Sequence, residues 1–149
     1  MIILDTNRIS ETLRPKPETR VLAWIDAQPL ETLYLTTITI AELRAGIALL
    51  RAGKRRNHLK DSLEQTLLPL FSDRTLSFDL ACAPAYARLL AKSRKAGRTI
   101  ATADAFIAAI ALTHNFAVAT RDTGPFKAAG VKVINPWHWE ELRQQTREP

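Results

Sequence analysis

The chain has 149 residues, the size of one ordinary domain, and 46% of them are hydrophobic, which excludes a disordered protein. A net charge of +6 and a pI near 9.9 favour a polyanionic partner, either nucleic acid or an acidic protein, over small acidic substrates. The single cysteine, Cys82, excludes an intramolecular disulfide and is interpreted as a core residue.

The N-terminal sequence contains no basic segment followed by an apolar run, so we expect no signal peptide. The longest apolar stretch, residues 100–119, is interrupted by Asp104 and His114. A carboxylate is costly in the middle of a membrane span, so this stretch predicts a buried helix followed by a strand. We therefore expect a soluble, cytoplasmic protein.

Short apolar runs alternate with helical patterns in the first half of the chain. Pro15 and Pro29 each follow the end of a helical pattern, whereas Thr39 is placed to open a helix and Gly53 to close it. The expected elements, in chain order, are a strand over residues 2–5, helices over 6–13 and 18–27, a strand over 33–36, and helices over 39–52 and 54–70.

The second half of the chain continues the alternation. Asp79 is a natural N-cap, Gly97 can close the helix that follows, and the last strand precedes Pro136. The expected elements are a strand over 74–78, helices over 80–95 and 102–114, a strand over 116–120, and a strand over 131–135 on an edge of the sheet. Such alternation is typical of a three-layer α/β/α domain with a mainly parallel sheet of about five strands.

Four acids occupy corresponding places in this arrangement. Asp5 ends the first strand, and Asp122 follows the fourth. Glu42 lies early in the helix after the second strand, and Asp104 lies in the first turn of the helix before the fourth. Ligands bind beyond the carboxyl ends of parallel strands, so all four carboxylates are expected to converge on that edge.

Each acid also has a purely structural interpretation. Asp5 could cap a helix, Glu42 could complete a capping box with Thr39, Asp104 could offset a helix dipole, and Asp122 could form an Asx turn. Capping does not explain why four acids share one edge. Close carboxylates raise one another's pKa and stay ionised most easily around a divalent cation, and hard oxygen ligands favour Mg²⁺ or Mn²⁺. The His and Cys residues show no zinc-ligand spacing.

Short polar residues and basic groups accompany the acids. Thr6, Asn7 and Thr120 could orient the carboxylates or bind metal waters, although turn formation explains Asn7 almost as well. Trp137 and Trp139 are interpreted mainly as packing residues. Two basic groups could neutralise phosphates, with about half of their members expected to be merely solvated: Arg51, Lys54, Arg55, Arg56 and Lys60, then Arg88, Lys92, Arg94, Lys95 and Arg98.

The ordered set LDTN, ELRAG, ADAFIAAIA, ATRDTG and VINPW resembles the PIN-domain ribonucleases, specifically the VapC- and FitB-type toxins of bacterial toxin–antitoxin pairs. The resemblance runs from Met1 to about Trp137, so we assign a PIN domain to residues 1–137 and no role to a tail over 138–149. It implies a metal-dependent endoribonuclease with Mg²⁺, or alternatively Mn²⁺, held by Asp5, Glu42, Asp104 and Asp122. Many relatives carry Asn in place of Asp122, so this residue would help directly or through water.

The resemblance also implies partners. It implies a homodimer and a small DNA-binding antitoxin, whose C-terminal segment lies in a groove of the toxin with a basic side chain near the acids. Thr120 matches the position of a small hydroxyl residue near the family's metal. The candidates for contact with RNA or antitoxin are Arg51, Lys54, Arg55, Lys92 and Arg98.

Three alternatives remain open from the sequence. The chain could be a non-catalytic binding module on the same scaffold, or a DNA nuclease with the same metal chemistry. It could also be a phosphotransferase or phosphatase with Asp5 as nucleophile, although Asn7 occupies the second place of the usual Asp-x-Asp arrangement. The absence of a GxGxxG or Walker A loop argues against nucleotide binding.

Overall fold

The computed structural model describes residues 1–140 and residue 143, so most of the tail assigned to 138–149 lies outside the described residues. One five-stranded sheet has the strand order β3-β2-β1-β4-β5, and all neighbouring strands pair in parallel. The strands are β1 (Ile2–Leu4), β2 (Leu33–Thr36), β3 (Thr75–Leu76), β4 (Ala117–Ala119) and β5 (Val133–Ile134). The predicted parallel sheet is confirmed, with β5 on an edge.

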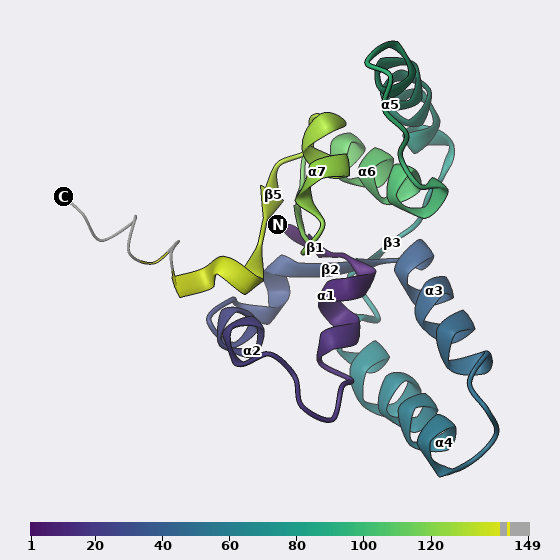
Figure 1. Ribbon diagram of the computed structural model, residues 1–149, viewed down its shortest axis with the longest axis vertical. Helices are drawn as coiled ribbons and strands as arrows, with labels where there is room; N and C mark the ends of the chain where they lie inside the picture. Colours follow the sequence, from purple (N-terminus) through teal and green to yellow (C-terminus); the bar gives the residue numbers. More distant parts are fainter. Residues whose placement is uncertain (141–142, 144–149) are drawn as a thin grey trace.

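Helices cover both faces of the sheet, as Figure 1 shows, which confirms the three-layer architecture. Helices α5, α6 and α7 lie on one face and α1 to α4 on the other. Their bounds are α1 (Thr6–Glu11), α2 (Thr19–Asp26), α3 (Thr37–Ala48), α4 (Lys54–Asp61), α5 (Ala83–Lys95), α6 (Thr102–His114) and α7 (Thr123–Ala128).

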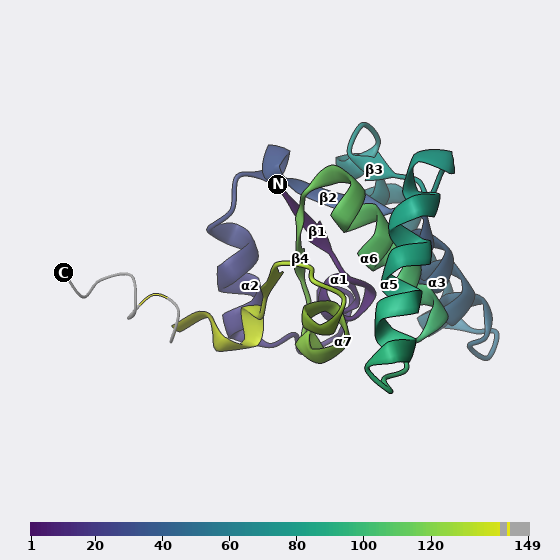
Figure 2. The same cartoon turned by 90° about the horizontal axis from the view of Figure 1, so that it is seen from above.

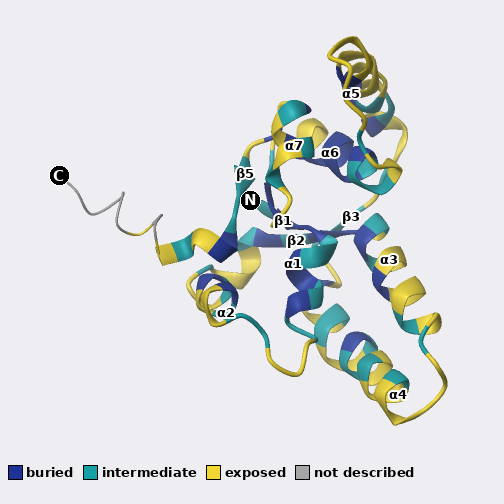
Figure 3. Cartoon of the chain, in the orientation of Figure 1, coloured by how far each residue is buried: buried dark blue, intermediate teal, exposed yellow. Residues whose placement is uncertain are grey.

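Alternating strand residues contribute to two hydrophobic cores, one on each face of the sheet, because successive side chains of a strand point to opposite faces. Ile3 and Val118 pack with α6 on one face, whereas Leu4 packs with Trp24 on the other. Helix α6 is mostly buried, as its colouring in Figure 3 shows, and its alanines allow close approach to the sheet. The central strands are therefore held rigidly from both sides. No helix in the described part of the chain is long and apolar enough to span a membrane.

The start of α3 differs from the sequence prediction. Thr36, not Thr39, is the N-cap, and its Oγ1 accepts a hydrogen bond from the Thr39 backbone N–H at 3.1 Å. The helix ends at Ala48, while Gly53 is the N-cap residue of α4 rather than the close of α3. Strand β2 thus runs directly into α3, and the expected capping box between Thr39 and Glu42 does not form.

The predicted single helix over residues 54–70 is also wrong. Helix α4 ends at Asp61 and is followed by a π-helix (Ser62–Leu67) and a 3-10 helix (Leu68–Phe71). Pro69 has no N–H to continue an α-helical ladder, and the change of helical period lets both Leu63 and Phe71 reach the core.

Two further boundaries complete the site's surroundings. Asp79 precedes a 3-10 turn (Leu80–Cys82) without capping it through its side chain, and α5 starts only at Ala83. Gly97 has φ +68° after α5, and the next N–H, from Arg98, donates to the Ser93 carbonyl at 2.9 Å, so the predicted stop at Gly97 is confirmed.

Helix α7 was not predicted, because Gly124 and Pro125 in TGPFKA favour a turn. Phe126, fully buried against the α6 side of the core, anchors this short helix.

Candidate functional site

Four acids reach the carboxyl edge of the sheet from four different elements. Asp5 follows β1 and is the N-cap residue of α1, and Asp122 follows β4 and stands at the N-cap position of α7. Strands β1 and β4 are adjacent, and the Asp5 N–H donates to the Ala119 carbonyl at 3.0 Å. Glu42 lies in α3 and Asp104 in the first turn of α6. Each acid thus lies at the position relative to the strands and helices that the sequence predicted.

Asp5 is the most enclosed of the four, with 4% of its surface exposed. Its Oδ1 accepts from the Thr6 backbone N–H at 2.8 Å, and its Oδ2 accepts from Thr120 Oγ1 at 2.9 Å. Burial raises the pKa of Asp5, the two hydrogen bonds counteract this rise, and the charges of Glu42 and Asp122 add to it. Asp5 therefore caps α1 and also faces other acids, so the structural and functional interpretations coexist.

Glu42 is connected to Asp5 through Thr6. The hydroxyl of Thr6 donates to Glu42 Oε1 at 2.6 Å, while the backbone N–H of the same residue binds Asp5. Glu42 itself is exposed. One threonine thus orients two carboxylates that are distant in sequence.

The pKa of Asp104 indicates that the four acids lie close together. Its burial raises its pKa to about 6, and the negative charges of Asp5, Glu42 and Asp122 contribute to the rise in that order. Like charges have this effect only at short range. The four carboxylates therefore share one electrostatic site.

Thr120 lies at the centre of the polar contacts behind the acids. Besides donating to Asp5, its Oγ1 accepts from the Asp122 backbone N–H at 3.2 Å and from Asn7 Nδ2 at 3.4 Å. Asn7 Oδ1 accepts in turn from the Arg121 backbone N–H at 3.4 Å. The side chain of Asp122 makes no capping bond, which leaves this carboxylate exposed toward the site. Thr6 and Thr120 thus contact the acids or their backbone, whereas Asn7 is connected to them through Thr120.

No ion pair to these four acids is present in the part of the chain that the structure describes. Among the residues that the structure describes, the ion pairs involve other acids, namely Glu11, Glu18, Glu64 and Asp73. Hard oxygen ligands with uncompensated charge fit a divalent cation such as Mg²⁺. No group of three Asp, Glu, His or Cys side chains in the described part of the chain is arranged to hold a metal ion together. Mg²⁺ does not require such a group, since it keeps several waters and binds through one or two carboxylates.

Two hollows flank the acids. A groove of about 840 Å³ between α1, α3 and α4 begins at Thr6 and Glu42, and Leu43 and Ile47 contribute to its apolar floor. A second hollow, of about 410 Å³, lies between α7 and the connection from α5 to α6. Glu42 lines the groove, whereas the second hollow, a trough, is lined by residues close to Asp104 and Asp122 in the chain and by none of the acids themselves.

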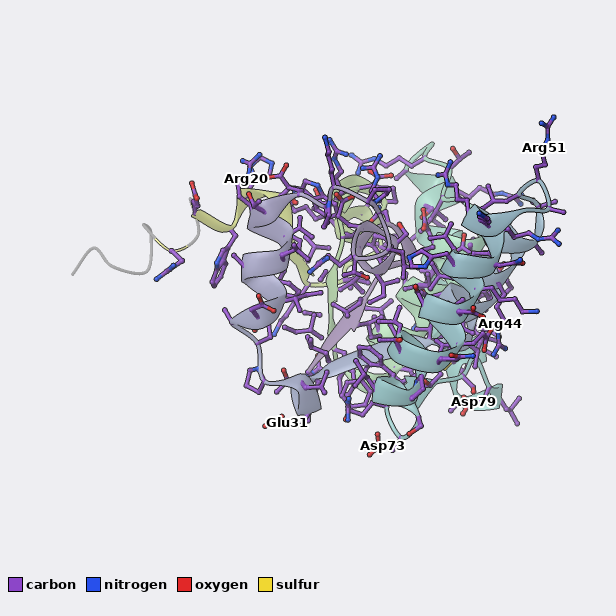
Figure 4. All side chains as sticks on the ribbon, turned by 90° about the horizontal axis from the view of Figure 1, so that it is seen from below. Arg20, Glu31, Arg44, Arg51, Asp73 and Asp79 are labelled. Atoms are coloured by element: carbon purple, nitrogen blue, oxygen red, sulfur yellow. The ribbon has the colours of Figure 1, made fainter. Side chains whose placement is uncertain are left out.

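The basic candidates divide between these two sides. Arg55 lines the groove, and Arg98 lines the trough. Arg51 and Lys54 lie with Arg55 around the α3–α4 loop, where Arg51 projects outward in Figure 4. Lys92 reaches from α5 toward the end of α7 and places its Nζ 3.8 Å from the Cβ position that a side chain would take at residue 130. The predicted contacts thus do not form one patch.

Some residues at the site were not recognised from the sequence. Arg121 lies next to Asp122 with its guanidinium 5.6 Å from the ring centre of Trp137, and the neighbouring acid was its only signal. Arg14 and His58 also line the groove, and nothing in the local sequence marks either of them as a site residue. Trp137 is buried and Trp139 packs against the core, in agreement with the packing interpretation.

Comparison with known proteins agrees with this geometry. The PIN domain family matches residues 2–132. The plasmid stability protein StbB of Pseudomonas syringae pv. tomato is 67% identical over 137 residues, which cover 92% of this chain and 99% of that protein. The VapC ribonuclease Y4jK of Sinorhizobium fredii is 54% identical, covering 92% and 98%, and toxin FitB of Neisseria gonorrhoeae is 55% identical, covering 93% and 99%. The crystal structure of FitAcB from Neisseria gonorrhoeae superposes with a TM-score of 0.89 at 55% identity, covering 93% of this chain and 99% of that chain.

Proposed function

Because this chain belongs to the PIN-domain family, we propose that it is the nuclease toxin of a toxin–antitoxin pair, hydrolysing RNA phosphodiester bonds with a divalent metal ion. The observation that carries the proposal is the mutual repulsion of four acids at the carboxyl edge, none of which is ion-paired within the described part of the chain. Relatives named VapC ribonuclease and toxin FitB support the choice of activity. Mg²⁺ is the proposed ion, with Mn²⁺ as substitute.

Asp5, Glu42 and Asp104 would hold the ion, one or two of them directly and the remainder through its waters, and Asp122 would assist directly or through water. A divalent ion supplies an activated water and stabilises the charge that develops on the phosphate oxygens. Thr120 and Thr6 keep the carboxylate of Asp5 oriented and favour its charged form. We assign no side chain as a covalent nucleophile.

The proposal includes partners. The groove between α1, α3 and α4 has an apolar floor suited to a segment of an antitoxin, and Arg14 and Arg55 at its side suit acidic residues of that segment. We also propose that the protein is cytoplasmic and forms a homodimer; Leu49 and Leu80, with 86% and 89% of their surface exposed, are candidates for contact with a second copy.

The direct test is cleavage of total RNA by the purified protein. We expect defined fragments with Mg²⁺, no cleavage with EDTA, and recovery when excess Mg²⁺ or Mn²⁺ is added. Cleavage that persists in EDTA would contradict the metal mechanism. Cleavage of DNA alone would support the DNA nuclease, and binding without cleavage of either would support the binding module.

Protons and metal should compete for Asp104. Its raised pKa means that the folded protein favours the protonated carboxyl, so without metal its contribution to stability falls as pH rises from 3.8 through about 6. Metal binding needs the ionised form, so Mg²⁺ affinity should be about tenfold weaker at pH 5 than at pH 7.

Thermal unfolding with EDTA and with Mg²⁺ at both pH values measures this effect. We expect Mg²⁺ to raise Tm more at pH 7 than at pH 5, and Asp104→Asn to remove most of the difference. An equal rise in Tm at both pH values would show that Asp104 is not coupled to the ion.

A further inference from the structure

The trough on the far side of the acids from the groove has a distinct chemistry. We call it the α5–α7 trough. Small and polar residues dominate its lining, in contrast to the apolar floor of the groove. The residues are Ser93, Gly97, Arg98, Thr99, Ile100, Gly124, Pro125 and Ala128. A neighbouring hollow of about 320 Å³ shares Arg98 and adds Arg94.

Both walls of the α5–α7 trough lead to the acids. One wall is the start of α7, which follows Asp122 directly, and the other is the connection that enters α6 just before Asp104. Figure 2 shows α7 and the end of α5 at the same edge of the molecule. The two walls of the trough are therefore continuous in the chain with Asp122 and Asp104, which places the acidic site next in sequence to both walls.

The charge around the trough is almost entirely positive. Residues 83–130 contain seven Lys or Arg and two acids, and the two acids are Asp104 and Asp122 themselves. Within the described part of the chain, no ion pair involves Lys92, Arg94 or Arg98. Lys92 reaches from α5 toward the end of α7, as its 3.8 Å approach to the Cβ position of residue 130 shows.

Two exposed acids lie on another edge of the molecule, away from the trough. In Figure 4, Glu31 and Asp73 project from the edge opposite Arg20 and Arg51, and each precedes a strand of the parallel sheet. Two acids thus lie at the amino ends of β2 and β3, whereas Arg20 and Arg51 project from the opposite edge. Unpaired cations beside a small, polar trough match a sugar–phosphate backbone better than an apolar peptide anchor.

We propose that the α5–α7 trough binds the RNA backbone on one side of the cleaved bond, with Arg98 and Lys92 contacting phosphates. This inference rests on the proposed ribonuclease function, since an endonuclease substrate extends on both sides of the bond that is cut. The groove between α1, α3 and α4 then receives the other side of the strand or a competing antitoxin segment. The two basic groups of the sequence therefore serve different parts of the substrate.

The test is RNA affinity without cleavage. The probe is a fluorescein-labelled, unstructured single-stranded RNA of about 20 nucleotides, followed by anisotropy in EDTA over a series of salt concentrations. Each lost phosphate contact should weaken binding about fivefold at about 0.1 M salt and reduce the log–log salt slope by about 0.7. Arg98→Gln should show this loss, and Arg98→Gln with Lys92→Gln should show about twice the change in slope.

Matched variants separate charge from fold. Lys132→Gln removes an equal charge at the amino end of β5, on the opposite edge of the sheet, and should leave affinity and slope unchanged. Arg98→Lys keeps the charge and should keep the slope. We expect the Tm of the Arg98 and Lys92 variants to equal that of the wild type, because both side chains are exposed. The hydrogen bond from residue 98 to the Ser93 carbonyl is donated by the backbone N–H, so the substitutions keep it.

Two results would overturn the inference. The first is wild-type affinity and slope in the Arg98→Gln/Lys92→Gln protein. The second is unchanged RNA binding together with weakened binding of polyglutamate, which would assign the trough to an acidic protein. Either result leaves the proposed function standing if the wild type still cleaves RNA with Mg²⁺, whereas absence of that cleavage would contradict the proposed function itself.

Discussion

Asp5→Asn is expected to lower the rate of RNA cleavage about 10³-fold, because losing one central ligand removes about 4 kcal/mol of the charge stabilisation that a metal supplies. The amide has the shape of the carboxylate, and its oxygen can still accept from the Thr6 N–H and cap α1. The change therefore removes the charge and keeps the capping bond, while the amide nitrogen takes the place of the oxygen that accepts from Thr120.

The stability of the same variant should move in the opposite direction. Burial and the neighbouring acids raise the pKa of Asp5, so its ionised form destabilises the metal-free fold at neutral pH. We expect the Tm of Asp5→Asn in EDTA to equal or exceed that of the wild type. A merely structural residue would lose stability together with activity.

Single-turnover cleavage of one labelled RNA, with Tm measured in parallel, tests this prediction. Asp26→Asn is the control, since Asp26 is an exposed acid at the end of α2. Wild-type cleavage by correctly folded Asp5→Asn in Mg²⁺ would remove Asp5 from the mechanism.

Thr120→Val should lower kcat about 10- to 100-fold, the usual effect of losing a side chain that orients a metal ligand. Valine has nearly the same shape, but it cannot donate to Asp5 Oδ2 or accept from the Asp122 N–H. Both groups would lose a buried partner, and two of the acids would lose their fixed orientation.

The pH dependence distinguishes this positioning role from simple damage. The bond from Thr120 lowers the pKa of Asp5, so its loss should raise that pKa and shift the acidic limb of the kcat profile to higher pH. Thr120→Ser keeps the hydroxyl and should restore both rate and profile. A Thr120→Val enzyme with the wild-type profile, or a serine variant as impaired as the valine variant, would contradict the assignment.

Sequence patterns were sufficient where one element decides its own structure. The apolar residues before Asp5 predicted β1. The alanine-rich stretch that ends at His114 predicted α6, and α6 has the predicted bounds. Parallel strands share a carboxyl edge, so the approximate position of Asp5 and Asp122 followed from chain order alone. This part of the site depends on topology rather than on side-chain detail.

Contacts between distant elements could not be predicted in the same way. Glu42 binds Thr6, 36 positions earlier, whereas the local pattern suggested a bond within its own helix. The N-cap of α3 is Thr36 rather than Thr39, because β2 leads directly into α3. The composition of this segment does not distinguish the two threonines. The raised pKa of Asp104 likewise depends on charges brought together only by folding.

The burial of Arg8 in the core is another feature that the sequence alone does not predict. It is fully buried in α1, its Nη2 donates to the Val21 carbonyl at 2.8 Å, and its guanidinium lies over Trp24. Burial lowers its pKa to about 10, and its Nε and Nη1 have no partner in the structure. A sequence predicts an arginine at such a position to be solvated, because arginine is rarely fully buried.

The most direct measurement is the anomalous diffraction of Mn²⁺ in crystals of the wild-type protein and of Asp5→Asn, grown under the same conditions. The proposed site requires a peak bounded by the carboxylates of Asp5, Glu42 and Asp104 in the wild type, and its loss in the variant. An ion bound elsewhere in a protein that cleaves RNA, or an undiminished peak in Asp5→Asn, would show that these acids do not share a catalytic metal.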